Sequence, residues 1–318
     1  MNTISPLAYV HPEAQLGDNN VIGPFCYIDK NTVLGDNNVL QNSVTINYGA
    51  RIGSDNEFFP GASISTKPQD LKFRGEDTVC VIGDHNSIRE NVTISRGTAS
   101  KGETIVGSHC LLMENMHVAH DCVLGNHLII GNSTKFAGEV VVDDYAIISA
   151  TCLIHQFCRV GGYGMFQGGS RTSQDIPPYI IAGKEPIRYA GVNLIGLRRH
   201  GFSNELIHLI HEAYRILYSK GLMAEGVDEI RRTMPDIPEL NYTPAFPDPR
   251  HWRPRLRDIR SRRSRPAWPW AIRWMRSGTR RPERAFWASN RQSTISFSSS
   301  RSGPSTSSRD LRESSARK

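Results

Sequence analysis

Residues 21–40 read VIGPFCYIDKNTVLGDNNVL, and four aliphatic residues recur in this stretch at intervals of six: Ile22, Ile28, Leu34 and Leu40. The same phase runs from Val10 to Phe166, and 24 of its 27 positions carry an aliphatic residue or Phe. Helices and plain strands have much shorter periods than six, whereas a parallel β-helix of hexapeptide repeats has this one. The pattern predicts a mainly β protein in which each hexad forms a short strand and a corner. The apolar side chain of each hexad then points into the coil.

Three positions of this phase are not apolar: Asp70, Glu76 and Ser100. They fall in two polar or glycine-bearing stretches, residues 65–81 and 95–105, after which the phase resumes. We interpret both stretches as loops that leave the coil. Loops on a rigid solenoid commonly carry functional residues, so we expect part of the functional site there.

The chain divides into three parts by pattern. The β-helix is predicted over residues 1–185, and Asp175-Ile-Pro-Pro-Tyr179 marks the end of its repeats. Residues 186–240 are predicted to form a small α-helical domain. It contains a short helix over 193–200, an amphipathic helix that Ser203 caps, and a further helix over 224–234.

Residues 241–318 form a tail of different character. They carry 19 Lys and Arg against 5 Asp and Glu, and 18 of the 19 are Arg. The whole chain has a net charge of +7, so the part before the tail is acidic. The tail also holds all five Trp and shows no apolar period, which predicts disorder and no part in catalysis. We favour out-of-frame translation as its origin over a basic segment for nucleic acid or membrane.

The cysteines, the N-terminal segment and the length of the apolar runs indicate in which cellular compartment the protein works. All six cysteines lie in the repeat region without a Cys-x-x-Cys pair, so we expect buried, reduced thiols. The N-terminus MNTISPLAYV lacks the basic and apolar segments of a signal peptide. No run approaches the roughly 18 apolar residues of a membrane-spanning helix. We therefore expect a cytoplasmic protein without integral membrane contact.

A candidate catalytic group follows from the geometry of the coil. Residues 18 apart stack in neighbouring turns of three hexads, about 4.8 Å apart. His120, Gly138 and Gln156 have this spacing, with His155 beside the column. Imidazole is a natural base near neutral pH, and an adjacent carboxylate such as Asp121 can orient it. A glycine lets a substrate approach a backbone N–H that can bind an oxyanion.

These residues lie in a segment that resembles a known family. Residues 112–126, LMENMHVAHDCVLGN, closely resemble the active-site stretch of the UDP-N-acetylglucosamine 3-O-acyltransferases of the hexapeptide-repeat superfamily. The resemblance covers about residues 5–240. Further matching stretches are 69–76 (QDLKFRGE), 88–98 (IRENVTISRGT), 154–158 (IHQFC), 174–179 (QDIPPY), 191–193 (GVN) and 196–202 (GLRRHGF).

The resemblance implies a homotrimer of left-handed parallel β-helices, each followed by a small helical domain, with active sites between subunits. The donor would be a 3-hydroxyacyl chain on acyl carrier protein. The acceptor would be the 3-hydroxyl of UDP-N-acetylglucosamine, in the first step of lipid A biosynthesis. The resemblance implies no cofactor and no metal.

The resemblance also assigns roles residue by residue. His120 would be the general base, Asp121 its orienting partner, and the backbone N–H of Gly138 the oxyanion donor. Gly168 falls where side-chain bulk sets acyl-chain length in the family. The expected substrate-binding residues are Gln69, Asp70, Lys72, His117, His155, Gln156, Gly168, Asn193 and Arg199.

Three positions depart from the family pattern. Glu139 follows the oxyanion glycine, where well-known members carry His. Ser95 replaces a frequent His before Arg-Gly-Thr, and Ile195 replaces an acidic residue. These departures concern contacts to the acceptor and leave the expected base and oxyanion positions intact.

Two other enzymes with the same coil are alternatives. The N-acyltransferase of the same pathway has an added N-terminal uridine-binding domain, for which repeats that begin at Val10 leave no room. A trimeric zinc carbonic anhydrase would use histidine ligands, and His117 and His120 suit zinc. No third ligand in register is evident. A non-enzymatic nucleic-acid binder would rest on the tail alone.

Overall fold

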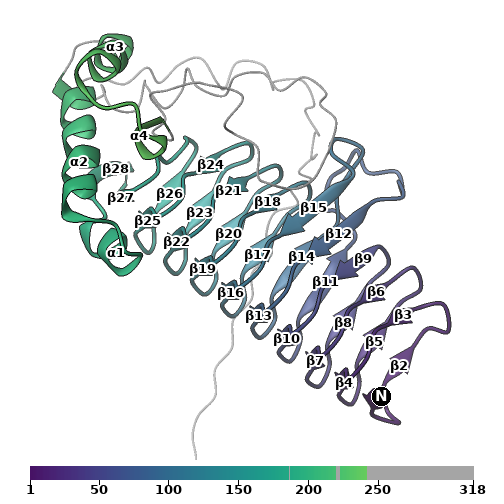
Figure 1. Cartoon of the computed structure of the whole chain (residues 1–318). Helices are drawn as coiled ribbons and strands as arrows, with labels where there is room; N and C mark the ends of the chain where they lie inside the picture. The colour runs from purple at the N-terminus through teal and green to yellow at the C-terminus, as the bar shows by residue number, and fades with distance from the viewer. Residues whose placement is uncertain (186, 220–222, 242–318) are drawn as a thin grey trace, which may run out of the picture. The chain divides into compact units, whose positions relative to one another are not determined.

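The computed structural model describes residues 1–185, 187–219 and 223–241. These residues belong to one compact unit. Residues 242–318 lie outside the described part of the chain, and so does the prediction of disorder for the tail. Figure 1 shows the described strands as successive turns of a coil that leads into helices.

The coil is built from three sheets, here named A, B and C, whose strands are mostly two residues long. Sheet A contains β1 (Thr3–Ile4), β4 (Val21–Ile22), β7 (Val39–Leu40), β10 (Glu57–Phe58), β13 (Ser87–Ile88), β16 (Leu111–Leu112), β19 (Ile129–Ile130), β22 (Ile147–Ile148), β25 (Met165–Phe166), β27 (Ile180–Gly183) and β28 (Arg188–Val192). Sheet B contains β2 (Tyr9–Val10), β5 (Tyr27–Ile28), β8 (Thr45–Ile46), β11 (Ser63–Thr66), β14 (Thr93–Ser95), β17 (His117–Val118), β20 (Lys135–Phe136), β23 (Leu153–Ile154) and β26 (Arg171–Thr172). Sheet C contains β3 (Gln15–Leu16), β6 (Val33–Leu34), β9 (Ala50–Ile52), β12 (Val79–Ile82), β15 (Glu103–Val106), β18 (Val123–Leu124), β21 (Val141–Val142) and β24 (Arg159–Val160).

The apolar residue of each hexad forms the core. From Ile22 to Phe166, every aliphatic or Phe residue of the phase is at most 4% exposed. Val10 and Leu16 are only partly buried, because each pairs with one neighbouring turn only. The predicted fold class, a mainly β parallel coil followed by helices, is confirmed.

From Asn19 onward, the six-residue corners of the coil turn through one residue in the left-handed backbone region. This residue lies three places after the inward apolar residue, as at Asn19 (φ 57°), Asn37 (φ 58°) and Asp121 (φ 61°). Asn and Asp tolerate this conformation better than most L-residues, which accounts for their frequency at the corners. The residue just before it, such as His120, therefore sits at an outer edge of the coil.

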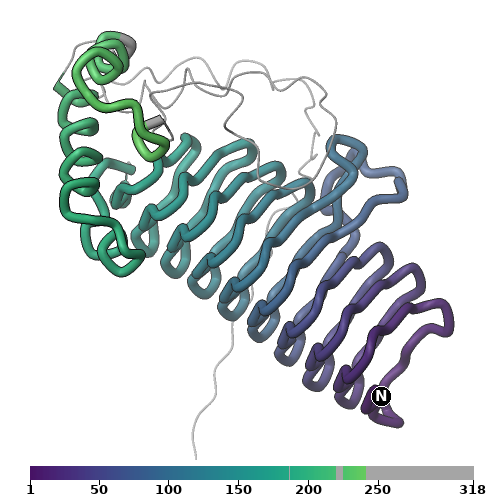
Figure 2. The backbone as a smooth tube through the Cα atoms, viewed as in Figure 1, coloured from purple at the N-terminus to yellow at the C-terminus, as the bar shows by residue number. Residues whose placement is uncertain are grey.

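Two turns are longer than eighteen residues. Ile82 pairs with Ile52, thirty positions earlier, and Val106 pairs with Ile82, twenty-four positions earlier. The extra residues are the predicted loops, here residues 67–78 and 96–102, and both lie where the chain passes from sheet B to sheet C. Figure 2 shows the loops as blue excursions from the coil. Their added lengths are multiples of six, so the apolar phase continues across them.

Helices follow the last turn of the coil. After the antiparallel pair β27–β28 come α1 (Leu194–Arg199), α2 (Asn204–Ser219), α3 (Met223–Thr233) and α4 (Pro238–Asn241). The first three agree with the predicted helices, and the Ser203 hydroxyl accepts a hydrogen bond from the Leu206 N–H at the start of α2. The buried hydroxyl of Tyr214 in α2 donates to the Pro178 carbonyl at 2.7 Å. The predicted division at residue 185 falls between β27 and β28 and stays a prediction.

Candidate active site

The predicted catalytic residues lie on the edge between sheets B and C, here called the B–C edge. This edge carries both loops, 67–78 and 96–102, and then the plain corners of the following turns. His120 and Asp121 form the corner between β17 and β18, and Gly138 lies at the next corner, between β20 and β21. One edge thus collects residues that are far apart in sequence.

His120 and Asp121 form a hydrogen-bonded pair. The Nδ1 atom of His120 lies 2.8 Å from Oδ2 of Asp121. The Asp121 side chain is fully buried, and that of His120 is 12% exposed. A carboxylate only accepts hydrogen bonds, so in the neutral form of the imidazole Nδ1 carries the proton and Nε2 keeps its lone pair. The pair therefore presents a base at Nε2.

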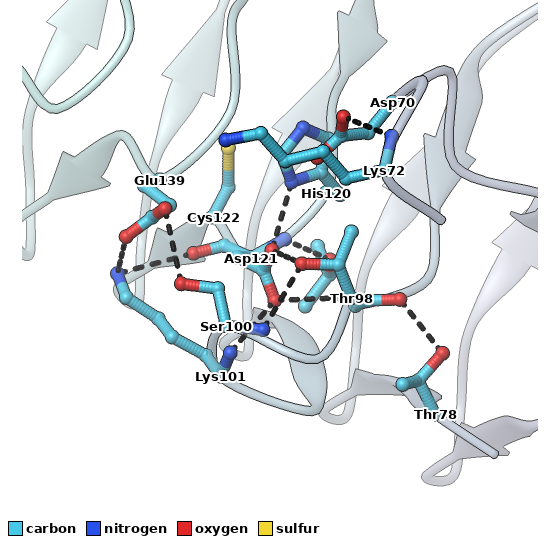
Figure 3. A network of polar contacts seen from close by, with 12 residues as sticks. Asp70, Lys72, Thr78, Thr98, Ser100, Lys101, His120, Asp121, Cys122 and Glu139 are labelled. Carbon is cyan, nitrogen blue, oxygen red and sulfur yellow. Dashed lines mark hydrogen bonds and ion pairs between the residues drawn. The ribbon is translucent and has the colours of Figure 1, made fainter. Parts of the chain in front are cut away.

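The loop 96–102 closes over the Asp121 carboxylate (Figure 3). Oδ1 of Asp121 accepts from the backbone N–H of Thr98 at 2.9 Å and, over a longer 3.3 Å, from that of Lys101. Oδ2 accepts from the Thr98 hydroxyl at 2.5 Å as well as from His120. A buried carboxylate is costly unless hydrogen-bonded, and here four donors compensate for the lost water.

Gly138 leaves the space that the imidazole occupies. A Cβ atom at residue 138 would lie 2.6 Å from Cε1 and 2.7 Å from Nε2 of His120. The Glu139 N–H donates to the His120 carbonyl at 3.0 Å, which stacks the two corners. Within the described residues, the N–H of Gly138 donates no hydrogen bond. This N–H can bind an anion formed next to Nε2.

Glu139 connects the corner between β20 and β21 to loop 96–102. One carboxylate oxygen accepts from the Ser100 hydroxyl at 3.1 Å, and the other lies 3.8 Å from Nζ of Lys101. Nζ of Lys101 also donates to the Asp121 carbonyl at 3.3 Å. Figure 3 shows Lys101 between Glu139 and Asp121. The Glu139 carboxylate thus contacts two residues of loop 96–102.

A groove of about 840 Å³ begins beside this corner and follows the outer face of sheet B. Its floor holds one outward residue from each of four successive strands, and its far wall comes from the β27–β28 connection. The lining residues that define it are His117, Lys135, Leu153, Arg171, His155 and Ile187. The groove has the size of a small-molecule site and offers both aliphatic surface and charged groups.

His117 and Cys122 flank the His120–Asp121 pair, and burial is the main cause that shifts the pKa of each. Burial lowers the pKa of His117, and the nearby positive charge of Lys135 lowers it further. Nδ1 of His117 lies 2.7 Å from the Thr93 hydroxyl. Burial raises the pKa of the Cys122 thiol to about 12, so this thiol is protonated and unsuited to act as a nucleophile.

The predicted loop residues lie on loop 67–78. Gln69 and Lys72 are exposed, and the Lys72 N–H donates to the Asp70 side chain at 2.9 Å. Phe73 is buried beneath the loop, with its ring 5.3 Å from the guanidinium carbon of Arg96. Phe73 thus anchors a loop whose polar side chains face outward.

The other predicted substrate residues lie at different places. His155 lines the groove, while Gln156 occupies the corner after Gly138. Gly168 is at the opposite edge of sheet B, between β25 and β26, and does not line the groove. Asn193 is 7% exposed and caps α1 through the Gly196 N–H, and Arg199 is exposed at the end of that helix. Their roles toward a substrate stay predictions.

Thr98 and Lys101 were absent from the predicted site. Thr98 lies 23 positions before Asp121, so the spacing of eighteen does not connect them. The signal available was the Arg-Gly-Thr98 motif inside a predicted loop. Within the described residues, no three His, Cys, Asp or Glu side chains gather as metal ligands would. None of the described helices is long and apolar enough to cross a membrane.

Comparison with known proteins gives consistent similarities. Residues 175–250 match a family model described as "Udp N-acetylglucosamine O-acyltransferase; Domain 2". A protein of Ectopseudomonas mendocina named acyl-[acyl-carrier-protein]–UDP-N-acetylglucosamine O-acyltransferase is 41% identical over 242 residues, which is 76% of this chain and 94% of the relative. A protein of Pseudomonas aeruginosa with the same name is 42% identical over 187 residues, 58% of this chain and 72% of the relative.

Solved structures show the same similarity in three dimensions. A UDP-N-acetylglucosamine acyltransferase from Bacteroides fragilis is 60% identical with a TM-score of 0.74, and the match covers 76% of this chain and 94% of that one. The corresponding enzyme of Francisella novicida is 40% identical with a TM-score of 0.70, over 72% of this chain and 85% of that one.

Proposed function

The chain belongs to the UDP-N-acetylglucosamine O-acyltransferase family, and from this premise we propose how its own residues perform the reaction. The enzyme transfers an acyl chain from acyl carrier protein to UDP-N-acetylglucosamine, the first step of lipid A biosynthesis. The acyl chain is a 3-hydroxyacyl group, and the acceptor is the 3-hydroxyl of the sugar. His120 is the general base.

The catalytic steps follow from the two stacked corners. Nε2 of His120 takes the proton of the sugar 3-hydroxyl, and the resulting oxygen nucleophile attacks the thioester carbonyl carbon. The carbonyl oxygen becomes an oxyanion that the Gly138 N–H binds. When this intermediate collapses, the carbon–sulfur bond breaks, and the imidazolium returns its proton to the departing thiolate. Asp121 holds the imidazole in the required tautomer throughout.

The observation that carries this proposal is the contact between Gly138 and His120. A Cβ atom at residue 138 would lie only 2.6 Å from the imidazole, so base and backbone donor are adjacent. Such adjacency is what transfer from a thioester requires, because proton removal and oxyanion formation occur within a few ångströms.

The groove and loop 67–78 supply the binding surfaces in this proposal. Gln69, Asp70 and Lys72 hold the nucleotide sugar, and His117 and His155 contact the substrates where the groove begins. The acyl chain follows sheet B toward Gly168, which lies at the far edge of that face, three strands further along the coil. Gln156, Asn193 and Arg199 complete the expected contacts.

The assembly and location belong to the same proposal. The active protein is a homotrimer in which clefts between subunits complete the site, and it works in the cytoplasm, where acyl carrier protein and sugar nucleotides are available. It needs no metal or other cofactor, and its partners include no nucleic acid. The outward row of the groove floor on sheet B gives a neighbouring copy a surface against which to enclose a chain.

A transfer assay tests the function. The full chain is incubated with UDP-N-acetylglucosamine and acyl-carrier-protein thioesters of several chain lengths, and the product is identified by mass and by its linkage. We expect an ester on the 3-hydroxyl and a clear preference for one length. An amide on the 2-amine of a glucosamine acceptor would support the N-acyltransferase instead, and activity that chelators remove would support a zinc enzyme.

A further inference from the structure

We propose that Thr98 is a positioning residue that fixes the orientation and tautomer of the catalytic pair through Asp121. The inference rests on the proposed function of that pair. It deepens that function by giving loop 96–102 a part in catalysis. Thr98 is 6% exposed and reaches only protein groups through its hydroxyl.

Thr98 binds both oxygens of one carboxylate. Its N–H donates to Oδ1 of Asp121 at 2.9 Å and its hydroxyl donates to Oδ2 at 2.5 Å. Two bonds from one residue to the two oxygens define the plane of the carboxylate, as a single bond cannot. Oδ2 is also the atom that His120 Nδ1 contacts at 2.8 Å. The Thr98 hydroxyl therefore places the oxygen that selects the tautomer of His120.

The alternative tautomer would be inactive. If Asp121 rotates away, the proton of the neutral imidazole can occupy Nε2, and the base then has no lone pair toward the substrate. The backbone N–H groups of Thr98 and Lys101 both bind Oδ1, so they leave Oδ2 without a second donor. Among the described contacts, only the Thr98 hydroxyl holds Oδ2 in place next to His120.

The loop itself is fixed from two sides. On the side of loop 67–78, the buried hydroxyl of Thr78 donates to the Gly97 carbonyl at 2.7 Å. On the side of the next corner, the Glu139 carboxylate accepts a hydrogen bond from the Ser100 hydroxyl and forms an ion pair with Lys101. The loop closes through the Gly102 N–H, which donates to the Thr98 carbonyl at 2.7 Å. Thr98 is therefore presented by a loop that is closed on itself and is bonded to Thr78 on one side and to Glu139 of the neighbouring corner on the other (Figure 3).

The kinetic test compares Thr98→Val with Thr98→Ser in the full-length protein. Valine keeps the shape and the backbone N–H but removes the hydroxyl, and serine restores the hydroxyl alone. We expect Thr98→Val to lower kcat by about tenfold to a hundredfold, with each KM within about twofold. Thr98→Ser should recover kcat to within about threefold of the unaltered enzyme.

Thr134→Val is the matched control. Thr134 is also a buried threonine, but its hydroxyl donates to a backbone carbonyl, that of Ser149 at 2.9 Å, at a different corner of the coil. Its loss should leave kcat unchanged. An equal fall in kcat for both valine variants, or failure of Thr98→Ser to restore it, would contradict the proposal, as would unaltered turnover of Thr98→Val.

A spectroscopic test needs no substrate. With ¹⁵N-labelled histidine at a pH where the rings are neutral, the His120 signals, identified by their absence from His120→Ala, report which ring nitrogen carries the proton. We expect the Nδ1–H form in the unaltered protein and a substantial Nε2–H population in Thr98→Val only. An unchanged His120 spectrum in Thr98→Val would overturn the inference. Because no acyl transfer is measured, this result stands apart from success or failure of the proposed function.

Discussion

The absent side chain of Gly138 is the most restrictive single feature of the site. Replacing Gly138 with Ala puts a Cβ 2.6 Å from the His120 ring, so the imidazole or the corner must move. We expect kcat to fall by about a hundredfold or more, since a misplacement of about 1 Å at a reacting group has this effect. Steady-state kinetics with the acyl-carrier-protein thioester measure the loss.

A stability measurement accompanies this variant. The Gly138→Ala protein should keep the circular dichroism spectrum and oligomeric state of the unaltered protein, because the apolar stack inside the coil does not involve residue 138. Gly138→Ala with normal turnover would show that the ring does not occupy the position described here, and the account of the oxyanion site would fail.

Two histidines couple the stability of the coil to pH. Burial is the main cause that lowers the pKa of His117 and of His127, with Lys135 and His109 respectively as the next causes. A depressed pKa in the folded state means that the unfolded chain binds protons more readily. The resulting stability is fully present above the unfolded value of about 6.5 and is lost as pH falls through the folded pKa.

Urea unfolding at several pH values between about 7.5 and 5.5 checks this prediction. The midpoint should fall toward acid, and a His117→Asn, His127→Asn double variant should show a smaller fall. Asp175 acts in the opposite direction, since burial raises its pKa to about 6, so the difference between the two proteins is the informative quantity. Equal slopes in both proteins would refute the assignment.

At the residue scale, contacts could be predicted from the sequence where the two residues are eighteen positions, or one turn of the coil, apart. His120 and Gly138 are one turn apart, and the structure confirms that they touch. Thr98 was not predicted because its contact to Asp121 crosses an inserted loop whose path no period describes. Asn193 was expected to contact the substrate, and the structure shows that its side chain caps α1 through the Gly196 N–H.

The loop 67–78 is the element on which acceptor binding depends in our proposal. Its anchor is Phe73, which is buried against Arg96, whose guanidinium carbon also lies 5.4 Å from the Tyr48 ring. Phe73→Ala should leave the loop in its binding arrangement only part of the time. An occupancy of about one tenth would raise the KM for UDP-N-acetylglucosamine about tenfold while kcat changes little.

Phe73→Leu is the graded control, because it keeps an apolar anchor of smaller size. Its KM for the sugar nucleotide should fall between those of the unaltered enzyme and Phe73→Ala. If Phe73→Ala altered kcat alone, or the KM for acyl carrier protein alone, loop 67–78 would not be the acceptor-binding element.

Elements with a strong period could be predicted, and elements without one could not. The hexad phase located the strands of the coil, and the 3.6-residue pattern around Ile207 and Ile210 located α2. The β27–β28 pair was missed, because Pro177 and Pro178 precede it and its strands carry no repeating pattern. The direction in which each loop folds back depends on contacts such as Thr98 to Asp121, which composition does not encode.

For the whole molecule, net charge distinguishes residues 1–240, which carry the candidate site, from residues 241–318. The positive net charge comes from residues 241–318, and every residue placed in the candidate site precedes them. A chain that ends at Asn241 should therefore keep kcat within about twofold. Any change should appear as a higher KM for acyl carrier protein at low salt that vanishes at high salt, because salt screens exposed charges. A loss of kcat on truncation would show that the segment serves catalysis.

The central claim is that His120 removes the proton of the acceptor hydroxyl. The most direct test is the initial rate at which purified His120→Ala forms the 3-O-acyl sugar nucleotide, compared with the unaltered enzyme under saturating substrates. We predict a rate lower by about 10²–10⁴-fold, with oligomeric state and thermal unfolding temperature unchanged. A well-folded His120→Ala enzyme that turns over at nearly the normal rate would contradict the account.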